Sequence, residues 1–190
     1  MRQSARPAQL WRNFLYNNLR RFLGLVFAII VFYFGLKTEK VLYWAIVLIF
    51  MGEFIRVWSA GYIKKNKVLS VVGPYRYVRN PLYVGSFLIG CGFGLFINNP
   101  IILVLLVAFF LYIYTLKINS EEIKLADIFG DKYLDYKKNV RRWLPGFTPY
   151  GDEQAHFDIK LAIFKNKEYN AILGCLAMIF LILIFKKHSL

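Results

Sequence analysis

The middle of the chain carries two polar blocks, GPYRYVRNPLYVG at residues 73–85 and EEIKLADIFGDKYLDYKK at residues 121–138. Between them lie two apolar runs, at 82–97 and 101–116, separated by the short turn sequence NNP. A connection this short is typical of antiparallel neighbouring helices. We therefore expect a helical hairpin whose two polar blocks return to the same end of the molecule.

Each helix of this hairpin is predicted to begin with an Asn-Pro pair, at Asn80-Pro81 and at Asn99-Pro100. An Asn side chain accepts a hydrogen bond from a free amide of the first turn, and Pro at the first helical position has no amide hydrogen to leave unpaired. The repeated pair therefore predicts where both helices start.

The composition predicts a membrane protein. The 190 residues are 58% hydrophobic and 18% aromatic, and 25 Lys and Arg stand against 11 Asp and Glu, a combination that is rare in soluble domains. Five apolar runs have about the length of a short membrane-crossing helix. They lie at 22–36, 41–52, 82–97, 101–116 and 170–185. The sequence thus predicts an all-α integral membrane protein with four or five transmembrane helices, and we favour the last run as a fifth span.

The basic residues separate to one side of these spans. Ten lie between Lys117 and Lys167, and others precede the first run or follow the second: Arg2, Arg6, Arg12, Arg20, Arg21, Lys64, Lys65, Lys67, Arg76 and Arg79. The positive-inside rule makes the N-terminus and both polar blocks cytoplasmic. On the opposite side we expect Lys37, Lys40, Lys186 and Lys187. Because the basic residues sit beside the spans, anionic lipid explains the net charge of +14, and no nucleic acid partner is expected.

Few polar residues fall within or behind the spans. Cys91 and Cys175 have no His or second Cys at ligand spacing, so we interpret them as buried hydrophobic residues without a disulfide or metal. Glu53 and Arg56, three residues apart, share a helix face; we favour an ion pair between them over a substrate contact. His156 is expected at the surface, in a polar loop.

The first polar block combines a turn with aromatic and basic side chains. Gly73-Pro74 is a turn signal. Tyr75, Arg76 and Arg79 follow it, just before a helix N-terminus whose free amides favour an anion such as a carboxylate or phosphate. The alternative is an aromatic belt with arginines that reach lipid head groups.

The second polar block predicts an amphipathic cytoplasmic helix that lies over the hairpin. Lys117 and Glu121 are four apart and share a face, and Asn119 and Glu122 have the spacing of a capping box for a helix that begins there. Apolar and aromatic residues then recur at helical spacing, at Leu125, Phe129, Tyr133 and Tyr136. This stripe can equally be packing alone.

Together the two blocks resemble the isoprenylcysteine carboxyl methyltransferase family and its relatives, the membrane phospholipid methyltransferases. The likeness runs from about Gly52 to Pro145, roughly half of the chain. It includes GEFIRVWSAG, GPYRYVRNPLYVG, the hydrophobic hairpin and EEIKLADIFGDKYLDYKKNVRRWLP, in the order and at the spacing of the family.

The resemblance implies an integral membrane enzyme that uses S-adenosylmethionine and releases S-adenosylhomocysteine, with the cofactor in a cytoplasmic pocket between the two blocks. The cofactor contacts carried over are Lys67, Val68, Leu69, Ser70, Tyr75, Asn80, Pro81, Leu82, Tyr83 and Glu121. We expect Lys117 to orient an acidic or phosphate-bearing substrate. Glu122 is expected to be either structural or an auxiliary base.

Two positions depart from the carboxyl methyltransferase pattern. Asn80 stands where those enzymes often have His before the Pro, and it can still donate a hydrogen bond. Lys117 stands where they carry an Arg that faces the substrate carboxylate, and lysine lacks the bidentate fork of arginine. The atom that is methylated therefore stays open among oxygen, nitrogen and sulfur.

One membrane methyltransferase domain is expected over 1–190, because no repeat or flexible linker divides the chain. Its parts are a basic segment at 1–21, a first hairpin at 22–58, a catalytic region at 59–145 and a tail at 146–190. The function expected is methylation of a lipidic acceptor that arrives from the bilayer, most like carboxyl methylation of isoprenylcysteine. The alternatives are a phospholipid N-methyltransferase and, from another class, a non-catalytic lipid-binding scaffold.

Overall fold

The computed structural model describes residues 22, 24–38, 40–64, 67–151 and 155–187, and the predicted basic segment at 1–21 lies outside them. The described residues contain helices and no strand, so the predicted all-α class is confirmed for this part of the chain. Every predicted apolar run forms a helix. These helices are Gly24–Lys37, α2 (Ala45–Ala60), α3 (Pro81–Phe96), α4 (Pro100–Phe129) and α6 (Tyr169–Lys187).

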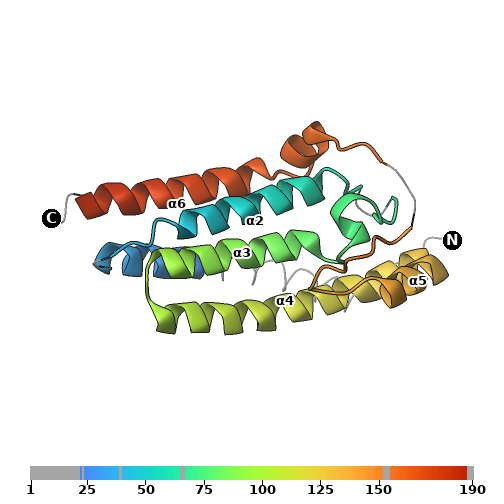
Figure 1. The fold of residues 1–190 in the computed structure, drawn as a ribbon, viewed down its shortest axis with the longest axis horizontal. Helices are drawn as coiled ribbons and strands as arrows, with labels where there is room; N and C mark the ends of the chain where they lie inside the picture. The colour runs from blue at the N-terminus through green and yellow to red at the C-terminus, as the bar shows by residue number, and fades with distance from the viewer. Residues whose placement is uncertain (1–21, 23, 39, 65–66, 152–154, 188–190) are drawn as a thin grey trace.

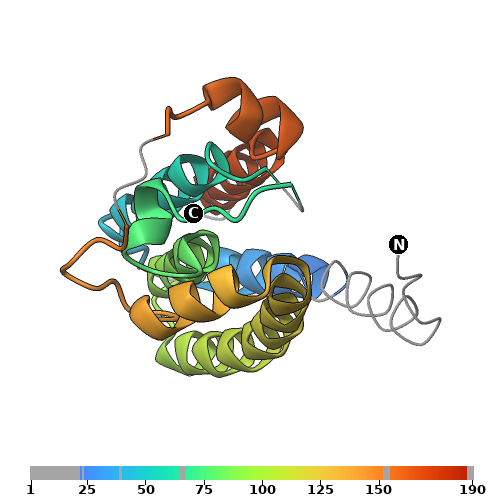
Figure 2. The ribbon, with the colours of Figure 1, turned by 90° about the vertical axis from the view of Figure 1, so that its right-hand side faces the viewer.

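Helices α2, α3, α4 and α6 run along the long axis of the molecule (Figure 1). The shorter elements gather at one end of this bundle. They are the 3-10 turn η1 (Gly73–Arg76), α5 (Asp131–Asn139) and the π-helix η2 (Leu161–Lys165). Both polar blocks therefore lie at the same end, as the hairpin prediction requires, and α6 ends at the opposite one (Figures 1 and 2).

The α3–α4 hairpin forms as predicted, but only one of its two Asn residues caps a helix. The Asn99 side chain accepts a hydrogen bond of 3.1 Å from the amide of Ile102. The Asn80 side chain makes no cap; its amide instead donates to the carbonyl oxygen of Arg142, 3.2 Å away. The prediction of a second Asn cap was wrong, because a tertiary contact uses this side chain.

Helices α2 and α3 approach closely because glycines face each other. A Cβ added to Gly52 would lie 2.6 Å from the carbonyl oxygen of Gly85, and one added to Gly85 would lie 2.6 Å from that of Gly52. Small residues let helix backbones come this near, as in many membrane bundles. Gly85 thus holds two helices together at the level where the polar blocks begin.

Helix α4 (Pro100–Phe129) continues beyond the apolar run at 101–116. The predicted helix start near Asn119 was wrong, since Asn119 lies inside a continuous helix of 30 residues. The break comes later, at Gly130, whose φ of +53° is the left-handed conformation that glycine adopts without strain. The predicted amphipathic helix is therefore divided between the end of α4 and α5.

The predicted aromatic stripe survives this division. Tyr133 and Tyr136 are buried with Val140, and Leu125 and Phe129 of α4 pack against them. Leu69 and Val71, from the segment before η1, cover the same cluster. The stripe therefore joins the two polar blocks through apolar contact.

The bundle presents apolar side chains outward, as a protein in lipid does. Exposed examples on α4 are Ile101, Val104, Leu105 and Phe109. Among the described helices, α4 is long and apolar enough to cross a membrane, whereas Gly24–Lys37, α3 and the Tyr169–Phe185 part of α6 are apolar but shorter.

Candidate functional site

The two polar blocks meet at a hydrogen bond between Tyr83 and Glu121. The Tyr83 hydroxyl, in the first turn of α3, donates to Glu121 Oε2 of α4 over 2.9 Å. Lys117 Nζ lies 3.3 Å from the other oxygen, Oε1, so the predicted Lys117–Glu121 face is confirmed. The Glu121 side chain is still 40% exposed. Its carboxylate is therefore held in place and remains accessible to a further hydrogen-bond donor.

The neighbouring Glu122 has a different environment. It is buried, and Arg142 binds both of its oxygens, at 3.2 and 2.7 Å. Arg79 and Lys137 add two more cations, each with a nitrogen 3.5 Å from the carboxylate. The Glu122 carboxylate therefore connects α4 to the segment before α3, to α5 and to the segment after α5. These contacts favour a structural role for Glu122 over the role of an auxiliary base.

The turn η1 brings Tyr75 into the same region. Gly73 has a φ of +58°, and a Cβ there would lie 2.4 Å from the ring of Tyr62, so both conformation and space require glycine. Tyr75 is buried, and its carbonyl oxygen accepts a hydrogen bond of 2.7 Å from the Tyr136 hydroxyl.

Burial holds the pKa of the Tyr75 phenol well above its ordinary value, and Tyr136 and the Glu121 and Glu168 carboxylates raise it further. Tyr75 therefore stays protonated at neutral pH and is suited to donate a hydrogen bond, not to remove a proton.

The predicted contact stretch 67–70 lies beside this cluster. The Ser70 hydroxyl donates to the carbonyl oxygen of Tyr62 over 2.8 Å, and Leu69 packs on the aromatic stripe. Val68 is exposed. The stretch thus packs through Leu69 against the aromatic stripe at the end of α4.

A segment after α5 crosses the first block as a strap. Its backbone bonds join Arg79 to Arg141, Gly146 to Tyr77 and Tyr150 to Arg76, at 2.8–3.0 Å. Arg76 also donates through its side chain to the carbonyl oxygens of Tyr150 and Gly151. The Arg76 side chain therefore holds this strap, which is a different role from an aromatic belt or an anion site.

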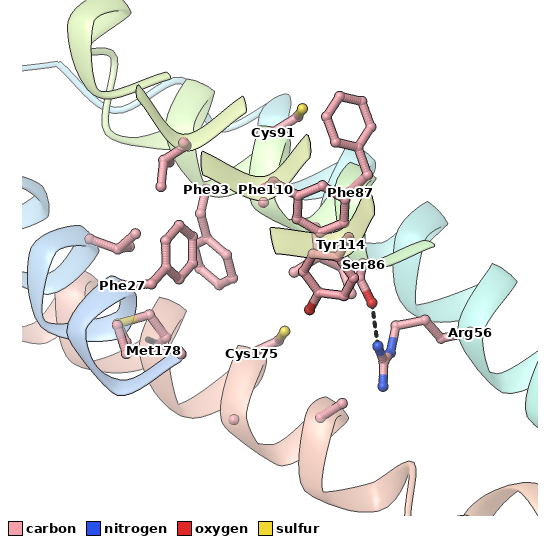
Figure 3. A pocket seen from close by; sticks show the side chains of 18 of the residues that line it. Phe27, Arg56, Ser86, Phe87, Cys91, Phe93, Phe110, Tyr114, Cys175 and Met178 are labelled. Atoms are coloured by element: carbon pink, nitrogen blue, oxygen red, sulfur yellow. Dashed lines mark hydrogen bonds between the residues drawn. The ribbon is translucent and has the colours of Figure 1, made fainter. Parts of the chain in front are cut away.

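A cavity of about 440 Å³ lies deeper between the helices, lined by residues of Gly24–Lys37, α2, α3, α4 and α6. Phe27, Phe93 and Met178 form part of its apolar wall (Figure 3). Arg56 and Ser86 mark its polar side, where Arg56 Nη1 donates to the Ser86 hydroxyl over 2.5 Å.

Arg56 does not pair with Glu53, so that prediction was wrong. Its guanidinium binds Glu168 instead, with Nε and Nη2 at 3.1 and 2.7 Å from one carboxylate oxygen. Glu168 lies just before α6, so this ion pair fastens the tail of the chain to α2.

Aromatic rings connect the cavity with the Tyr83–Glu121 contact. The ring centroids of Tyr83 and Tyr114 are 5.1 Å apart, and Tyr114 stacks on Phe110 at 3.9 Å. Tyr114 and Phe110 line the cavity (Figure 3). The aromatic rings of Phe110 and Tyr114 therefore lie between the cavity and this contact.

The polar groups at the Tyr83–Glu121 contact fit S-adenosylmethionine, the cofactor that the family resemblance implies. An accessible carboxylate can accept hydrogen bonds from hydroxyl or ammonium groups, which this nucleoside carries, and the buried Tyr75 supplies a neutral donor nearby. The hydrogen bond from Tyr83 already orients the Glu121 carboxylate, so its oxygens would not need to be ordered when the cofactor binds.

Sequence reasoning brought together most of this site and missed some of its members. Tyr83, Glu121 and Lys117 are in contact, as the hairpin predicted. The residues missed are Ser86, Tyr114, Arg142 and Glu168. Ser86 and Tyr114 lie one helical turn from Tyr83 and Lys117, and that spacing was the available signal. Glu168 offered none.

Comparison with known proteins gives a consistent match. The sequence model of one family, described as phospholipid methyltransferase, matches residues 19–132. The Protein-S-isoprenylcysteine O-methyltransferase of Schizosaccharomyces pombe is 34% identical over 84 residues, which cover 43% of this chain and 36% of that protein. The protein of the same name from Xenopus laevis is 31% identical over 112 residues, covering 53% and 39%.

A bacterial relative has a different name. The nickel-cobalt-cadmium resistance protein NccN of Alcaligenes xylosoxydans xylosoxydans is 29% identical over 108 residues, which cover 56% of this chain and 50% of that protein. The matches thus span between about a third and a half of these relatives. No solved structure gives a significant match.

Proposed function

Because this chain belongs to the phospholipid methyltransferase family, we propose that it is an integral membrane enzyme that transfers a methyl group from S-adenosylmethionine to a lipidic acceptor. The reaction most like this one is carboxyl methylation of isoprenylcysteine, after which several relatives are named. Methylation of a phospholipid amine is the second candidate. The family description favours it, and so does the presence of Lys117 where the carboxyl methyltransferases carry an arginine.

The observation that carries the proposal is the Tyr83–Glu121 hydrogen bond, because it joins the two blocks that define the resemblance. Glu121 would hold the cofactor through its accessible oxygens. Tyr83 positions the carboxylate, and Tyr75 would donate a hydrogen bond. The stretch Lys67–Ser70 and the Asn80, Pro81 and Leu82 segment would form the walls of the pocket.

The cofactor supplies an electrophilic methyl group on a sulfonium sulfur. The residues of this chain need only align the acceptor behind that carbon and keep water away. In the transfer, a bond forms between the acceptor atom and the methyl carbon while the carbon–sulfur bond breaks, and its electron pair stays on sulfur. A carboxylate acceptor needs no base, whereas an amine must first lose a proton.

Lys117 would orient the acceptor. Its ammonium lies beside Glu121 and is partly exposed, so it can attract a carboxylate or phosphate to the point where the cofactor is held. The acceptor tail would extend into the cavity past Tyr114 and Phe110, since hydrocarbon partitions into that apolar space. Both ends of a lipid would then be bound at once.

The membrane arrangement is part of the proposal. Four or five of the apolar helices would cross the bilayer, in the cytoplasmic membrane of a bacterium or the endoplasmic reticulum of a eukaryote. The polar end of the bundle, where Lys117, Lys137 and Arg142 lie, would face the cytoplasm.

The test is a titration of the purified protein in nanodiscs with S-adenosylhomocysteine, compared with Glu121→Gln. Loss of the carboxylate should weaken binding about tenfold or more, as expected for a charge-assisted hydrogen bond. Asp127→Asn is the matched control, because Asp127 is an exposed acid on the same helix. Undiminished affinity in Glu121→Gln would refute the assignment.

A second measurement identifies the acceptor. Total membrane lipids and prenylcysteine peptides are incubated with methyl-labelled S-adenosylmethionine and the wild-type protein, and the labelled product is analysed. A protein that binds no S-adenosyl compound and labels nothing is the non-catalytic scaffold of the alternative hypothesis.

A further inference from the structure

The cavity contains a carboxylate that the site described above does not use. Glu53, in the middle of α2, lines the cavity and is 7% exposed. Its Oε1 accepts a hydrogen bond from Cys175 Sγ, 3.1 Å away. Its Oε2 is buried and has no hydrogen-bond partner among the described residues. A buried polar atom without a partner costs free energy, so such an atom in a cavity marks where a ligand group would bind.

The single cation of the described cavity wall is already engaged. Arg56 gives two hydrogen bonds to Glu168 and one to Ser86. Its charge is therefore balanced by Glu168, and Glu53 is a surplus acid in the cavity wall. On α6, Cys175 donates to Oε1 only, and the lining residues Gly174 and Met178 have no side-chain donor.

The depth of Glu53 follows from helix geometry. Gly52, next to Glu53 on α2, faces Gly85 of α3, which is two residues beyond Tyr83. The two helices run in opposite directions, so Glu53 is level with the turn of α3 that contains Ser86. At 1.5 Å per residue, Glu53 lies about 4 Å deeper than Tyr83.

We propose that Glu53 Oε2 is a specificity determinant, which selects an acceptor that carries a hydrogen-bond donor in the part bound by the cavity, about 4 Å deeper than Tyr83. The donor is a hydroxyl, amide or ammonium group, because a carboxylate oxygen can only accept. This inference rests on the proposed function, and among lipidic acceptors it favours an amphiphile with a second polar group inside the cavity. An acceptor with a plain hydrocarbon tail, such as isoprenylcysteine, leaves Oε2 unpaired and should bind less tightly.

The experiment compares two probes that differ at one oxygen substituent. Dodecanol and dodecyl methyl ether have the same alkyl chain, but the ether carries a methyl group where the alcohol has a hydrogen to donate. Their dissociation constants are measured by displacement of a fluorescent fatty amphiphile from the full-length protein in nanodiscs. The wild type should bind dodecanol about tenfold more tightly than the ether, since one hydrogen bond to a charged group distinguishes them.

Three variants localise this preference. Glu53→Leu should bind both probes within about twofold of each other, because the acceptor is gone. Glu53→Gln keeps a carbonyl oxygen of the same shape and should retain part of the preference. Cys91→Ala, elsewhere in the same cavity wall, should retain all of it. The Gln variant also serves if the Leu variant does not fold.

The outcomes are decisive for each hypothesis separately. Equal affinity of the wild type for alcohol and ether, or an unchanged preference in Glu53→Leu, overturns the inference. Binding of S-adenosylhomocysteine is measured on the same samples. Its absence would refute the proposed function, while the alcohol preference would report on the cavity alone.

Discussion

Substitution by glutamine should change different properties at the two adjacent glutamates of α4, Glu121 and Glu122. Glu122→Gln removes the charge that Arg142, Arg79 and Lys137 surround, and it leaves three cations around an uncharged amide. Glu121→Gln removes a charge whose ion pair with Lys117 is partly exposed and whose hydrogen bond from Tyr83 an amide oxygen can still accept. The first change should affect stability and the second should affect ligand binding.

The magnitude follows from burial. Removing one partner of a buried ion pair costs about 3–5 kcal/mol, and the partial exposure of Arg142 and Lys137 reduces this to about 2–3 kcal/mol for Glu122→Gln. For a domain of this size that corresponds to a melting temperature lower by about 4–12 °C. Glu121→Gln should cost at most about 1 kcal/mol, because exposed ion pairs contribute little.

The assay is thermal unfolding in nanodiscs at one fixed heating rate, followed by near-ultraviolet circular dichroism. Both variants are measured beside the wild type, and S-adenosylhomocysteine affinity is determined for each. A Glu122→Gln protein that melts within a degree of the wild type, or a Glu121→Gln protein that loses as much stability as its neighbour, would refute the reasoning.

Three further predictions concern packing, a hydrogen bond and pH. Gly85→Ala should lower stability by about 1–3 kcal/mol, because its methyl group would meet a backbone carbonyl oxygen of α2; Gly90→Ala, with open space around it, is the control, and equal melting temperatures would contradict the close approach. Tyr136→Phe should cost about 1–2 kcal/mol in the same melting assay, since the carbonyl oxygen of Tyr75 loses its buried donor; an unchanged melting temperature would count against that bond. Burial raises the pKa of Tyr133 from 10.0 to about 12, so the folded protein keeps a proton that the unfolded chain has lost, and stability should fall as pH rises through this window. Melting temperatures between pH 9 and 12 should therefore decline less steeply for Tyr133→Phe than for the wild type, and parallel curves would exclude this residue.

Local patterns predicted the parts of the structure that local forces determine. The α3–α4 hairpin follows from its apolar runs and the NNP turn, and the aromatic stripe follows from helical spacing. The meeting of Tyr83 and Glu121 is a geometric consequence of the hairpin, because a short turn returns both outer ends to one level. These features required no knowledge of distant residues.

The wrong predictions concern polar side chains that had two possible hydrogen-bond or ion-pair partners. Asn119 and Glu122 have capping-box spacing, yet the same spacing occurs on any helix, and burial of Glu122 under Arg142 kept α4 continuous. Arg56 had an acid three residues away but bound Glu168, 112 residues along the chain. No sequence periodicity connects residues so far apart, so tertiary packing decides between the two acids.

The uninterrupted length of α4 fixes the distance between Glu121 and the first residue of this helix, Pro100. A rise of 1.5 Å per residue puts Glu121 about 32 Å along the axis from Pro100, close to the roughly 30 Å thickness of bilayer hydrocarbon. In the proposed membrane arrangement, this one helix would set the height of Glu121 above the opposite leaflet. A thicker bilayer would then draw the proposed reacting groups below the water boundary, so turnover should depend on the chain length of the surrounding lipids.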